Sequence, residues 1–326
     1  MRDIGAGLLD LSSRGRILVS GSEAVTFLNG LITNDIKTLA LGSWMPAAFP
    51  NVQGRLIAAS RVIHRQDGFL IDTEGVTHDA VLKLVERFTL AGDFRVADLT
   101  AETALFSIQG AKASEVVSTA LGELASLGNG AAKVVDWHDV PLTIIRATHT
   151  GEDGFDLFVP KSHAEALWSE IVSAGARPVG LEAFETLRIE AGIARYGLDM
   201  DETNVVTETN LDDAVSFTKG CYIGQEIIAR IKYRGHVAKK LTGLMFEGEV
   251  ALKSGAKILS ADKEIGRITS VAFSPRLNRT IALGYVKYDY LTPGTSVQIV
   301  GDDEQNPAHV SKLPFVHGTW NSNANG

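Results

Sequence analysis

The sequence predicts an α+β protein in three parts, two mixed α+β units followed by an all-β barrel or sandwich. Its 326 residues are 45% hydrophobic and 21% charged, which is the composition of a globular protein with room for two or three domains. Strand and helix patterns alternate up to Gly192 with short connections, which favours α+β over a doubly wound α/β sheet. After Lys240 the helical period disappears.

The first unit is expected to combine four strands with two helices. Runs of aliphatic and β-branched residues between turn residues predict strands at 16–20, 45–49, 56–63 and 68–72. Apolar residues three or four positions apart predict the two helices. The first is marked by Val25, Leu28 and Ile32, and the second by Val81, Leu84, Val85 and Phe88. Each helix can bury its apolar stripe against the sheet.

The second unit repeats this arrangement. Strands are expected at 105–108, 142–146 and 155–159, and the last two flank a tight turn with Gly151 and Gly154 around two acids. Helical periodicity predicts helices at 111–121, 164–172 and 181–192. Gly192 suits the C-terminal end of the last helix.

The third unit is expected to contain only strands, separated by Gly, Pro, Asn and Asp. The predicted strands are 241–246, 256–259, 265–273, 281–286, 296–300 and 309–313. We therefore divide the chain into residues 1–239 for the two α+β units, 240–318 for the β unit, and a polar tail, 319–326, that is expected to fray.

Charge and composition exclude several classes of function. The net charge of −8 argues against nucleic-acid binding as the main activity, although residues 219–240 carry six basic residues and one acid. That stretch suits either an anionic partner or a solvated surface. No membrane span or signal peptide is visible, and a single cysteine fits a reducing compartment, so we expect a cytoplasmic protein without a membrane partner. No metal-binding pattern is present in the sequence.

The most unusual local sequence surrounds the only thiol. It consists of Lys219, Gly220, Cys221, Tyr222, Ile223, Gly224, Gln225 and Glu226. Lys219 and the downstream Arg230 and Lys232 would favour a reactive thiolate, which makes Cys221 a candidate functional residue. The alternative is that Cys221 is a small buried residue without a chemical role, as free cysteines often are.

Two further residues are candidates for ligand binding. Arg188 offers a planar guanidinium that can grip a carboxylate or the edge of a ring, although it can equally pair with Glu185 on a helix surface. Asp156 follows the turn at 151–154 and can accept two N–H donors from an aminopyrimidine, or it can face solvent.

Residues 219–226 resemble the K-G-C-Y-x-G-Q-E motif of the YgfZ family, whose members support iron–sulfur cluster assembly. The rest of the chain, over about residues 5–318, resembles the wider superfamily of the glycine-cleavage T-protein, a tetrahydrofolate-dependent aminomethyltransferase. The blocks that carry this resemblance are 27–35, 51–55, 150–156 and 187–192.

This resemblance implies a cloverleaf of two interlocked α+β units and a C-terminal antiparallel β-barrel around a folate site. It implies that Asp156, Arg188 and Tyr196 bind tetrahydrofolate or a derivative. One departure concerns the reaction, because the Asp pair of T-proteins corresponds here to Ala58 and Ala59. Alanine cannot accept a hydrogen bond or a proton, which puts aminomethyl transfer in doubt.

The resulting functional hypothesis is a tetrahydrofolate-binding accessory protein for iron–sulfur enzymes, including enzymes that modify tRNA. Its expected partners are folate and iron–sulfur proteins or their assembly factors. Two alternatives remain, a folate-dependent aminomethyltransferase of the T-protein type and a folate-free scaffold that docks a partner through residues 219–240.

Overall fold

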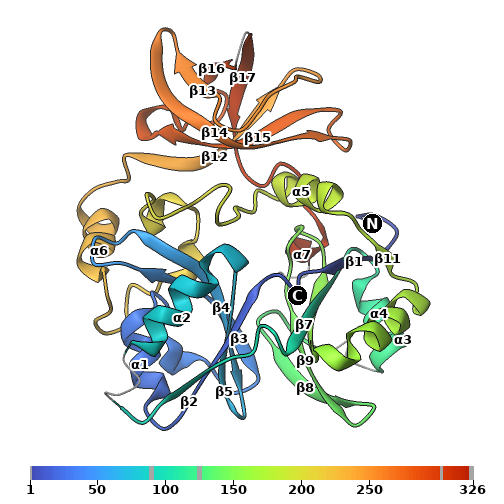
Figure 1. The fold of residues 1–326 in the computed structure, drawn as a ribbon. Coiled ribbons are helices and arrows are strands. Elements are labelled where there is room, and N and C mark those ends of the chain that lie inside the picture. Colours follow the sequence, from blue (N-terminus) through green and yellow to red (C-terminus); the bar gives the residue numbers. More distant parts are fainter. Residues whose placement is uncertain (1, 88–91, 123–126, 302–303, 323–326) are drawn as a thin grey trace.

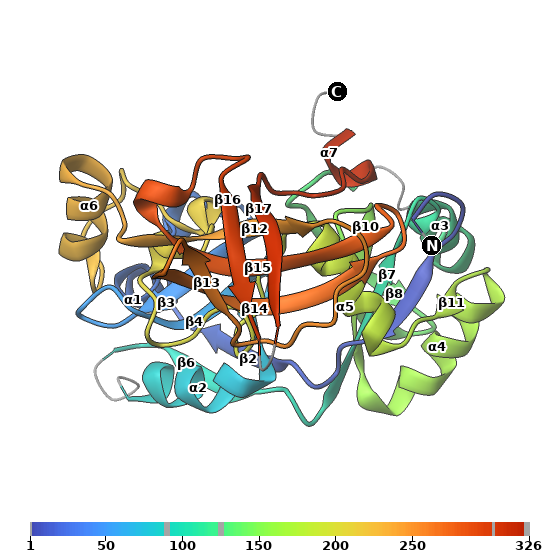
Figure 2. The same cartoon turned by 90° about the horizontal axis from the view of Figure 1, so that it is seen from above.

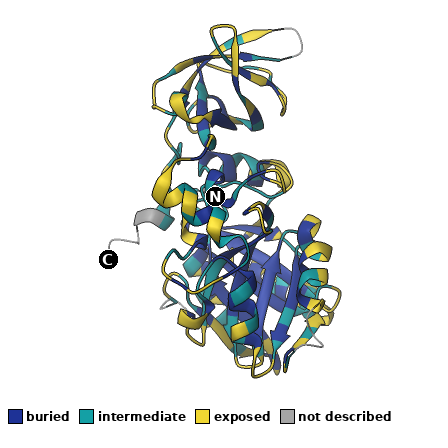
Figure 3. Cartoon of the chain, turned by 90° about the vertical axis from the view of Figure 1, so that its left-hand side faces the viewer, coloured by how far each residue is buried: buried dark blue, intermediate teal, exposed yellow. Residues whose placement is uncertain are grey.

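A computed structural model describes residues 2–87, 92–122, 127–301 and 304–322. Two mixed α+β units lie side by side, and a barrel of strands sits above both (Figure 1). Burial concentrates in the sheets, and most exposed residues lie on the outer helices and loops (Figure 3). The predicted α+β fold with a C-terminal antiparallel β-barrel is confirmed.

The first unit is built on a five-stranded antiparallel sheet in the order β3-β4-β5-β2-β6. Its strands are β2 (Gly15–Ser20), β3 (Ser43–Pro50), β4 (Leu56–Arg65), β5 (Gly68–Thr73) and β6 (Arg95–Asp98), and its helices are α1 (Ala24–Leu31) and α2 (His78–Glu86). Ile17, Val62 and Ile71 of the sheet form one core with Leu28 and Val81 of the helices. The apolar stripes predicted from periodicity therefore do face the sheet. Phe88, the last predicted stripe residue, lies outside the described residues.

The second unit has a six-stranded sheet in the order β11-β1-β7-β10-β9-β8. Its elements are β1 (Gly7–Asp10), β7 (Thr103–Gln109), β8 (Ala132–Trp137), β9 (Val140–Arg146), β10 (Gly154–Pro160), β11 (Arg177–Pro178), α3 (Ala113–Leu121) and α4 (Ala164–Ser173). The first strand of the chain, β1, pairs with β7 of this second sheet, so the two units are interlocked. A strand of four residues has little local signal, and its partner lies almost a hundred residues away.

The two sheets pack against each other, and the helices cover their outer faces. Ile63 and Leu70 of the first sheet share a core with Leu105, Ile145 and Phe158 of the second. Because side chains alternate along a strand, residues 59, 61 and 63 of β4 all face this inter-sheet space.

The C-terminal unit is a closed barrel in the order β12-β15-β14-β13-β16-β17 (Figure 2). Its strands are β12 (Lys239–Phe246), β13 (Lys257–Ser260), β14 (Lys263–Ser274), β15 (Arg279–Lys287), β16 (Ser296–Val300) and β17 (Gln305–Ser311). Each matches a predicted strand to within a few residues. Helix α5 (Leu181–Glu190) packs on the barrel through Ile189, which contacts a cluster with Leu241 and Leu283.

The end of the chain returns to the second unit. Instead of fraying from residue 319, the polar tail begins with the short helix α7 (Thr319–Ser322). The backbone N–H of Thr319 donates to Glu152 Oε2 at 2.9 Å, and that of Trp320 donates to the Gly151 carbonyl at 3.2 Å. The turn that precedes β10 therefore anchors the chain end, and residues 323–326 lie outside the described residues.

Candidate functional site

A cavity of about 440 Å³ lies where the two units meet α5 and the segment that follows it. This volume falls in the usual range for small-molecule sites. Trp44, Phe184 and Tyr196 supply aromatic walls. The polar and charged lining residues include Arg14, Ser60, Arg61, Glu74, His149, Arg188 and Arg195. An aromatic cavity with a few polar groups suits a planar, hydrogen-bonding ligand.

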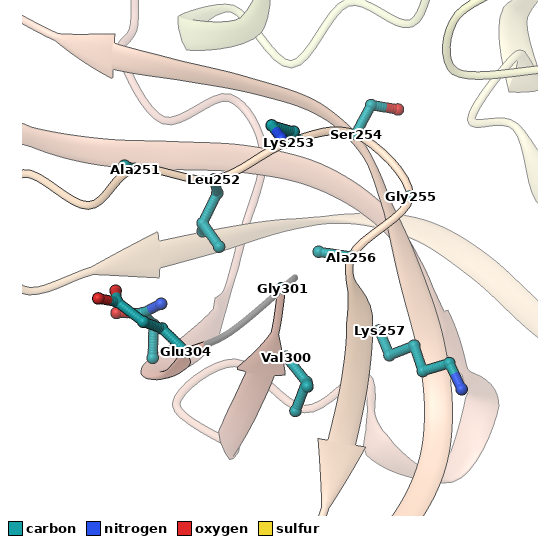
Figure 4. Close-up of a pocket in the computed structure, with 11 residues that line it drawn as sticks. Ala251, Leu252, Lys253, Ser254, Gly255, Ala256, Lys257, Val300, Gly301 and Glu304 are labelled. Carbon is teal, nitrogen blue, oxygen red and sulfur yellow. The ribbon is translucent and has the colours of Figure 1, made fainter.

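A larger pocket of about 840 Å³ opens within the barrel (Figure 4). It is lined by the loop 251–257 and by Val300, Gly301, Glu304 and Asn306. None of the ligand-binding residues predicted from the sequence lines it, whereas Arg188 and Tyr196 both line the cavity between the units. We therefore take the cavity between the units as the candidate functional site.

A buried ion cluster forms one wall of this cavity. Arg61 reaches Asp72 with Nη2 at 2.6 Å and Asp156 with Nη1 at 2.6 Å. Arg14 reaches the other oxygen of Asp72 with Nε at 2.9 Å, and it also pairs with Glu74. Both Asp72 and Asp156 are fully buried. Arg61 thus connects the first sheet to the second.

The strand register places this cluster. Arg61 on β4 stands directly opposite Asp72 on β5, and cross-strand pairs of opposite charge are favourable. Asp156 lies on β10 of the facing sheet. Burial alone would raise the pKa of Asp156, but His149 and Arg61 outweigh burial and hold that pKa well below its ordinary value. Burial also opposes the shift at Asp72, whose pKa is lowered by Arg14 and Arg61.

Asp156 is not among the residues that line the cavity. Its Oδ2 is engaged by Arg61 and by His149 Nε2 at 2.9 Å, and these two residues present their own side chains to the cavity. Asp156 is therefore placed to organise the wall, and direct folate binding by this residue stays a prediction.

Arg188 has its guanidinium fully engaged within the protein. It is 2% exposed, and its donors reach Glu185 at 2.7 Å and Asp199 at 2.7 Å, the carbonyl oxygen of Ile193, and Ser270 of the barrel. The pairing with Glu185 that the sequence offered as an alternative is therefore present. Arg188 joins α5 to the barrel, and its contact with folate stays a prediction.

Tyr196 lines the cavity, and its hydroxyl donates to the Leu56 carbonyl at 3.1 Å. Burial raises the pKa of Tyr196 to about 12, so the phenol stays protonated at neutral pH.

Ala58 and Ala59, which stand where an Asp pair was expected, have different surroundings. Ala58 is fully buried in the core of the first unit, while Ala59 lines the cavity. Their separation follows from the alternation of side chains along β4. Of the two positions, only residue 59 can present a side chain to a ligand.

The Cys221 motif lies outside the cavity lining and is held firmly to the first unit. The buried Lys219 ammonium donates to the carbonyl oxygens of Asn29, Ile32 and Asn34 at 2.8, 2.9 and 2.6 Å, beside the end of α1. Tyr222 is also buried, but Cys221 is exposed. The packing alternative for Cys221 is therefore wrong, and a functional role for its thiol stays a prediction.

Gly224 has a structural reason to be glycine. Its φ of +78° is in the left-handed region, and a Cβ there would collide with the Asn51 carbonyl oxygen. The motif then continues into helix α6 (Gln225–Arg234), where Glu226 pairs with Arg230 at 2.7 Å. Several motif residues thus serve to dock the segment 219–226.

Within the described ranges, no helix combines the length and the apolar character that a membrane crossing requires. In the same ranges, no three His, Cys, Asp or Glu side chains come together as a possible metal site.

Two mixed α+β units share a cavity of small-molecule size and support a β-barrel, which defines the class of fold. Residues 3–219 match the GCVT N-terminal domain, and residues 239–317 match the glycine cleavage T-protein C-terminal barrel domain. The chain belongs to the glycine-cleavage T-protein family.

Proteins named as aminomethyltransferases are similar in sequence to this chain over nearly its whole length. An aminomethyltransferase of Rubrobacter xylanophilus is 32% identical over 98% of this chain and 86% of its own, and one of Thermotoga neapolitana is 30% identical over 96% and 87%. The crystal structure of the glycine cleavage system aminomethyltransferase T from Bartonella henselae superposes with a TM-score of 0.89 at 25% identity, covering 98% of this chain and 88% of that one.

These relatives overturn the main functional hypothesis. An accessory role in iron–sulfur assembly is wrong, because full-length relatives at about 30% identity are named aminomethyltransferases. The alternative of an aminomethyltransferase is the better supported one. Aminomethyltransferases of this family use tetrahydrofolate, which agrees with the cofactor expected from the sequence.

Three residues of the site, Arg61, His149 and Trp44, were not predicted from the sequence. A signal for Arg61 was present, since an arginine inside a run as apolar as 56–63 requires a buried partner. His149 and Trp44 come from segments whose juxtaposition depends on the packing of the two sheets, which no local pattern reveals.

We predict that Arg61→Leu lowers the free energy of unfolding by about 3–5 kcal/mol, because it leaves two buried carboxylates without their shared cation. Arg65→Leu, on the same strand, removes a more exposed pair with Asp67 and should cost less than about 1 kcal/mol. Urea unfolding of both variants measures the difference. Similar small losses would show that the cluster does not stabilise the fold.

The same ion cluster predicts that the free energy of unfolding depends on pH. The folded-state pKa values of Asp72 and Asp156 lie below those of the unfolded chain, so their contribution is present above about pH 4 and is lost as the pH falls further. The unfolding free energy of the wild type should therefore decrease on acidification more steeply than that of Arg61→Leu. Parallel pH profiles of the two proteins would contradict this assignment.

We also predict that Gly224→Ala destabilises the protein by at least about 1 kcal/mol, because of the left-handed backbone and the collision with the Asn51 carbonyl. Gly220→Ala is the matched control within the motif, since a Cβ there meets nothing within 4 Å. Thermal unfolding of both variants checks this, and equal stability of the two would refute the docking role.

Proposed function

We propose that this protein binds a reduced folate in the cavity between its two α+β units and transfers an aminomethyl one-carbon unit to it. The observation that carries the proposal is the aromatic, arginine-lined cavity of about 440 Å³ in a chain that is similar over its whole length to aminomethyltransferases. The similarity to aminomethyltransferases supports the class of reaction, and the cavity supports the place where folate would bind.

The cavity residues fit a folate. Trp44, Phe184 and Tyr196 can pack against a flat heterocyclic ring, and the small Ala59 side chain leaves room beside them. Arg195 lines the cavity with its side chain 32% exposed and pairs with Glu185 and Glu74. Its guanidinium has further donors that suit a carboxylate of a glutamyl tail. The aromatic residues thus suit the ring of a folate, and Arg195 suits its glutamyl tail.

A bound tetrahydrofolate supplies nucleophilic ring nitrogens for one-carbon chemistry. The protein's own part is to hold the ring, to keep water away from it and to manage protons. Tyr196 remains a neutral hydroxyl, and Arg61 keeps Asp156 ionised behind His149. Residue 59 is an alanine and contributes no proton acceptor.

Within the family, we propose that the chain belongs to the YgfZ-type branch. The proposal is supported by the match of residues 219–226 to the K-G-C-Y-x-G-Q-E pattern. The anchoring of Lys219 and the left-handed Gly224 give this pattern a structural purpose. The proposal concerns the sequence branch alone, because the iron–sulfur role expected of that branch is contradicted by the aminomethyltransferase relatives.

We predict that Ala59→Leu weakens tetrahydrofolate binding at least tenfold, because the larger side chain occupies cavity space. Ala59→Ser adds only one atom and should bind within about threefold of the wild type. Titration calorimetry measures both affinities, and thermal unfolding verifies that the variants remain folded. If Ala59→Leu is folded and keeps the wild-type affinity for tetrahydrofolate, folate does not bind in this cavity.

The transfer reaction has its own test. The wild-type protein, given tetrahydrofolate and an aminomethylated carrier protein, should release ammonia in a folate-dependent manner. Folate binding without any ammonia release would contradict the transferase proposal while leaving the binding site intact.

A further inference from the structure

The proposed transfer needs a group in the cavity that can accept and return a proton, and Ala59 cannot do so. Besides Tyr196 and the arginines, three titratable side chains line the cavity: Asp10, Glu74 and His149. Glu74 is paired with Arg14 and Arg195, and Asp10 is an exposed residue that accepts from the Ser12 N–H. His149 is the group that is both enclosed and held in place.

The hydrogen bonds of His149 assign its protons. Nε2 lies 2.9 Å from Asp156 Oδ2 and 3.5 Å from Arg61 Nη1. Because Asp156 is an ionised acceptor and the guanidinium contact is too long for a good bond, the single proton of the neutral ring belongs on Nε2 and is donated to Asp156. Nδ1 is then an acceptor, and it makes no hydrogen bond with any residue in the described ranges.

The ring is fixed from several sides. The backbone N–H of His149 donates to Gln109 Oε1 at 2.9 Å, and the ring meets Phe184 edge to face at 6.2 Å between centroids. Its side chain is 14% exposed. A histidine oriented by a buried carboxylate, with its other nitrogen unengaged beside a cavity, has the arrangement of a general base.

We propose that His149 is a catalytic residue that moves a proton through Nδ1, with Asp156 and Arg61 as positioning residues. This inference rests on the proposed function. In the overall reaction, a carrier S–CH₂–NH₂ and two folate N–H groups give a methylene bridge between two folate nitrogens, a carrier thiol and ammonia. Two protons leave the folate nitrogens. Nδ1 of His149 takes one and returns it to the departing ammonia, while the other ends on the thiol.

The first test observes the ring directly and needs no turnover. Ring-nitrogen NMR of the ¹⁵N-labelled full chain should show His149, assigned by its loss in His149→Gln, as the Nε2–H form. Saturating tetrahydrofolate should shift its Nδ1 resonance and leave that of the exposed His317 unchanged. An Nδ1 resonance that does not move at saturation would overturn the inference.

The second test separates chemistry from binding. His149→Gln should lower kcat by about 10²–10⁴-fold, while the Kd for tetrahydrofolate changes less than threefold. His317→Gln is the matched control and should keep the wild-type kcat. Adding Ala59→Asp to His149→Gln restores a carboxylate at the cavity wall and should recover at least tenfold in kcat.

The outcomes distinguish the inference from the function on which it rests. Wild-type kcat in a folded His149→Gln overturns the role of His149 and leaves the transferase intact. A wild type that binds folate without turnover contradicts the transferase proposal, and the NMR shift then still decides whether His149 contacts the ligand.

Discussion

The guanidinium of Arg61 holds the two halves of the cavity together. It stands on the first sheet and binds one carboxylate of its own sheet and one of the facing sheet, both at 2.6 Å. Two buried carboxylates so close to each other would repel without a cation between them. Because breaking such a cluster is far more costly than breaking a surface pair, the sheets are fixed in one relative position. The wall that carries His149 depends on that position.

The other charged residues and glycines singled out in the sequence support the framework around the cavity. Arg188 connects α5 to the barrel with every guanidinium nitrogen engaged, so the barrel positions the helix that contributes Phe184 to the cavity. Lys219 and Gly224 instead fix the Cys221 segment against the first unit, outside the cavity lining. Charged and glycine residues that look functional in the sequence thus stabilise the framework on which other residues act.

The sequence predicted the architecture better than the site. Periodicity located helices α1 to α5 and all six barrel strands because each carries its own local pattern. It did not locate α6, β6 or β8. It also did not locate β1, because a four-residue strand obtains its identity from pairing with β7. The prediction of the site residues was incomplete for a similar reason. Asp156 and Arg188 were candidates from their chemistry and from the family blocks, but whether each faces the cavity is decided by tertiary contacts with Arg61, His149 and Asp199. The family resemblance supplied the correct superfamily, while one local motif favoured the wrong function.

The most direct measurement is a crystal structure of the full chain saturated with tetrahydrofolate. The account predicts the folate ring in the cavity between the two α+β units, in contact with residue 59 and with Nδ1 of His149. The Arg61 cluster should be unchanged around it. Folate bound elsewhere, for example in the barrel pocket around Lys257, or a cavity that stays empty at saturating folate, would contradict the account.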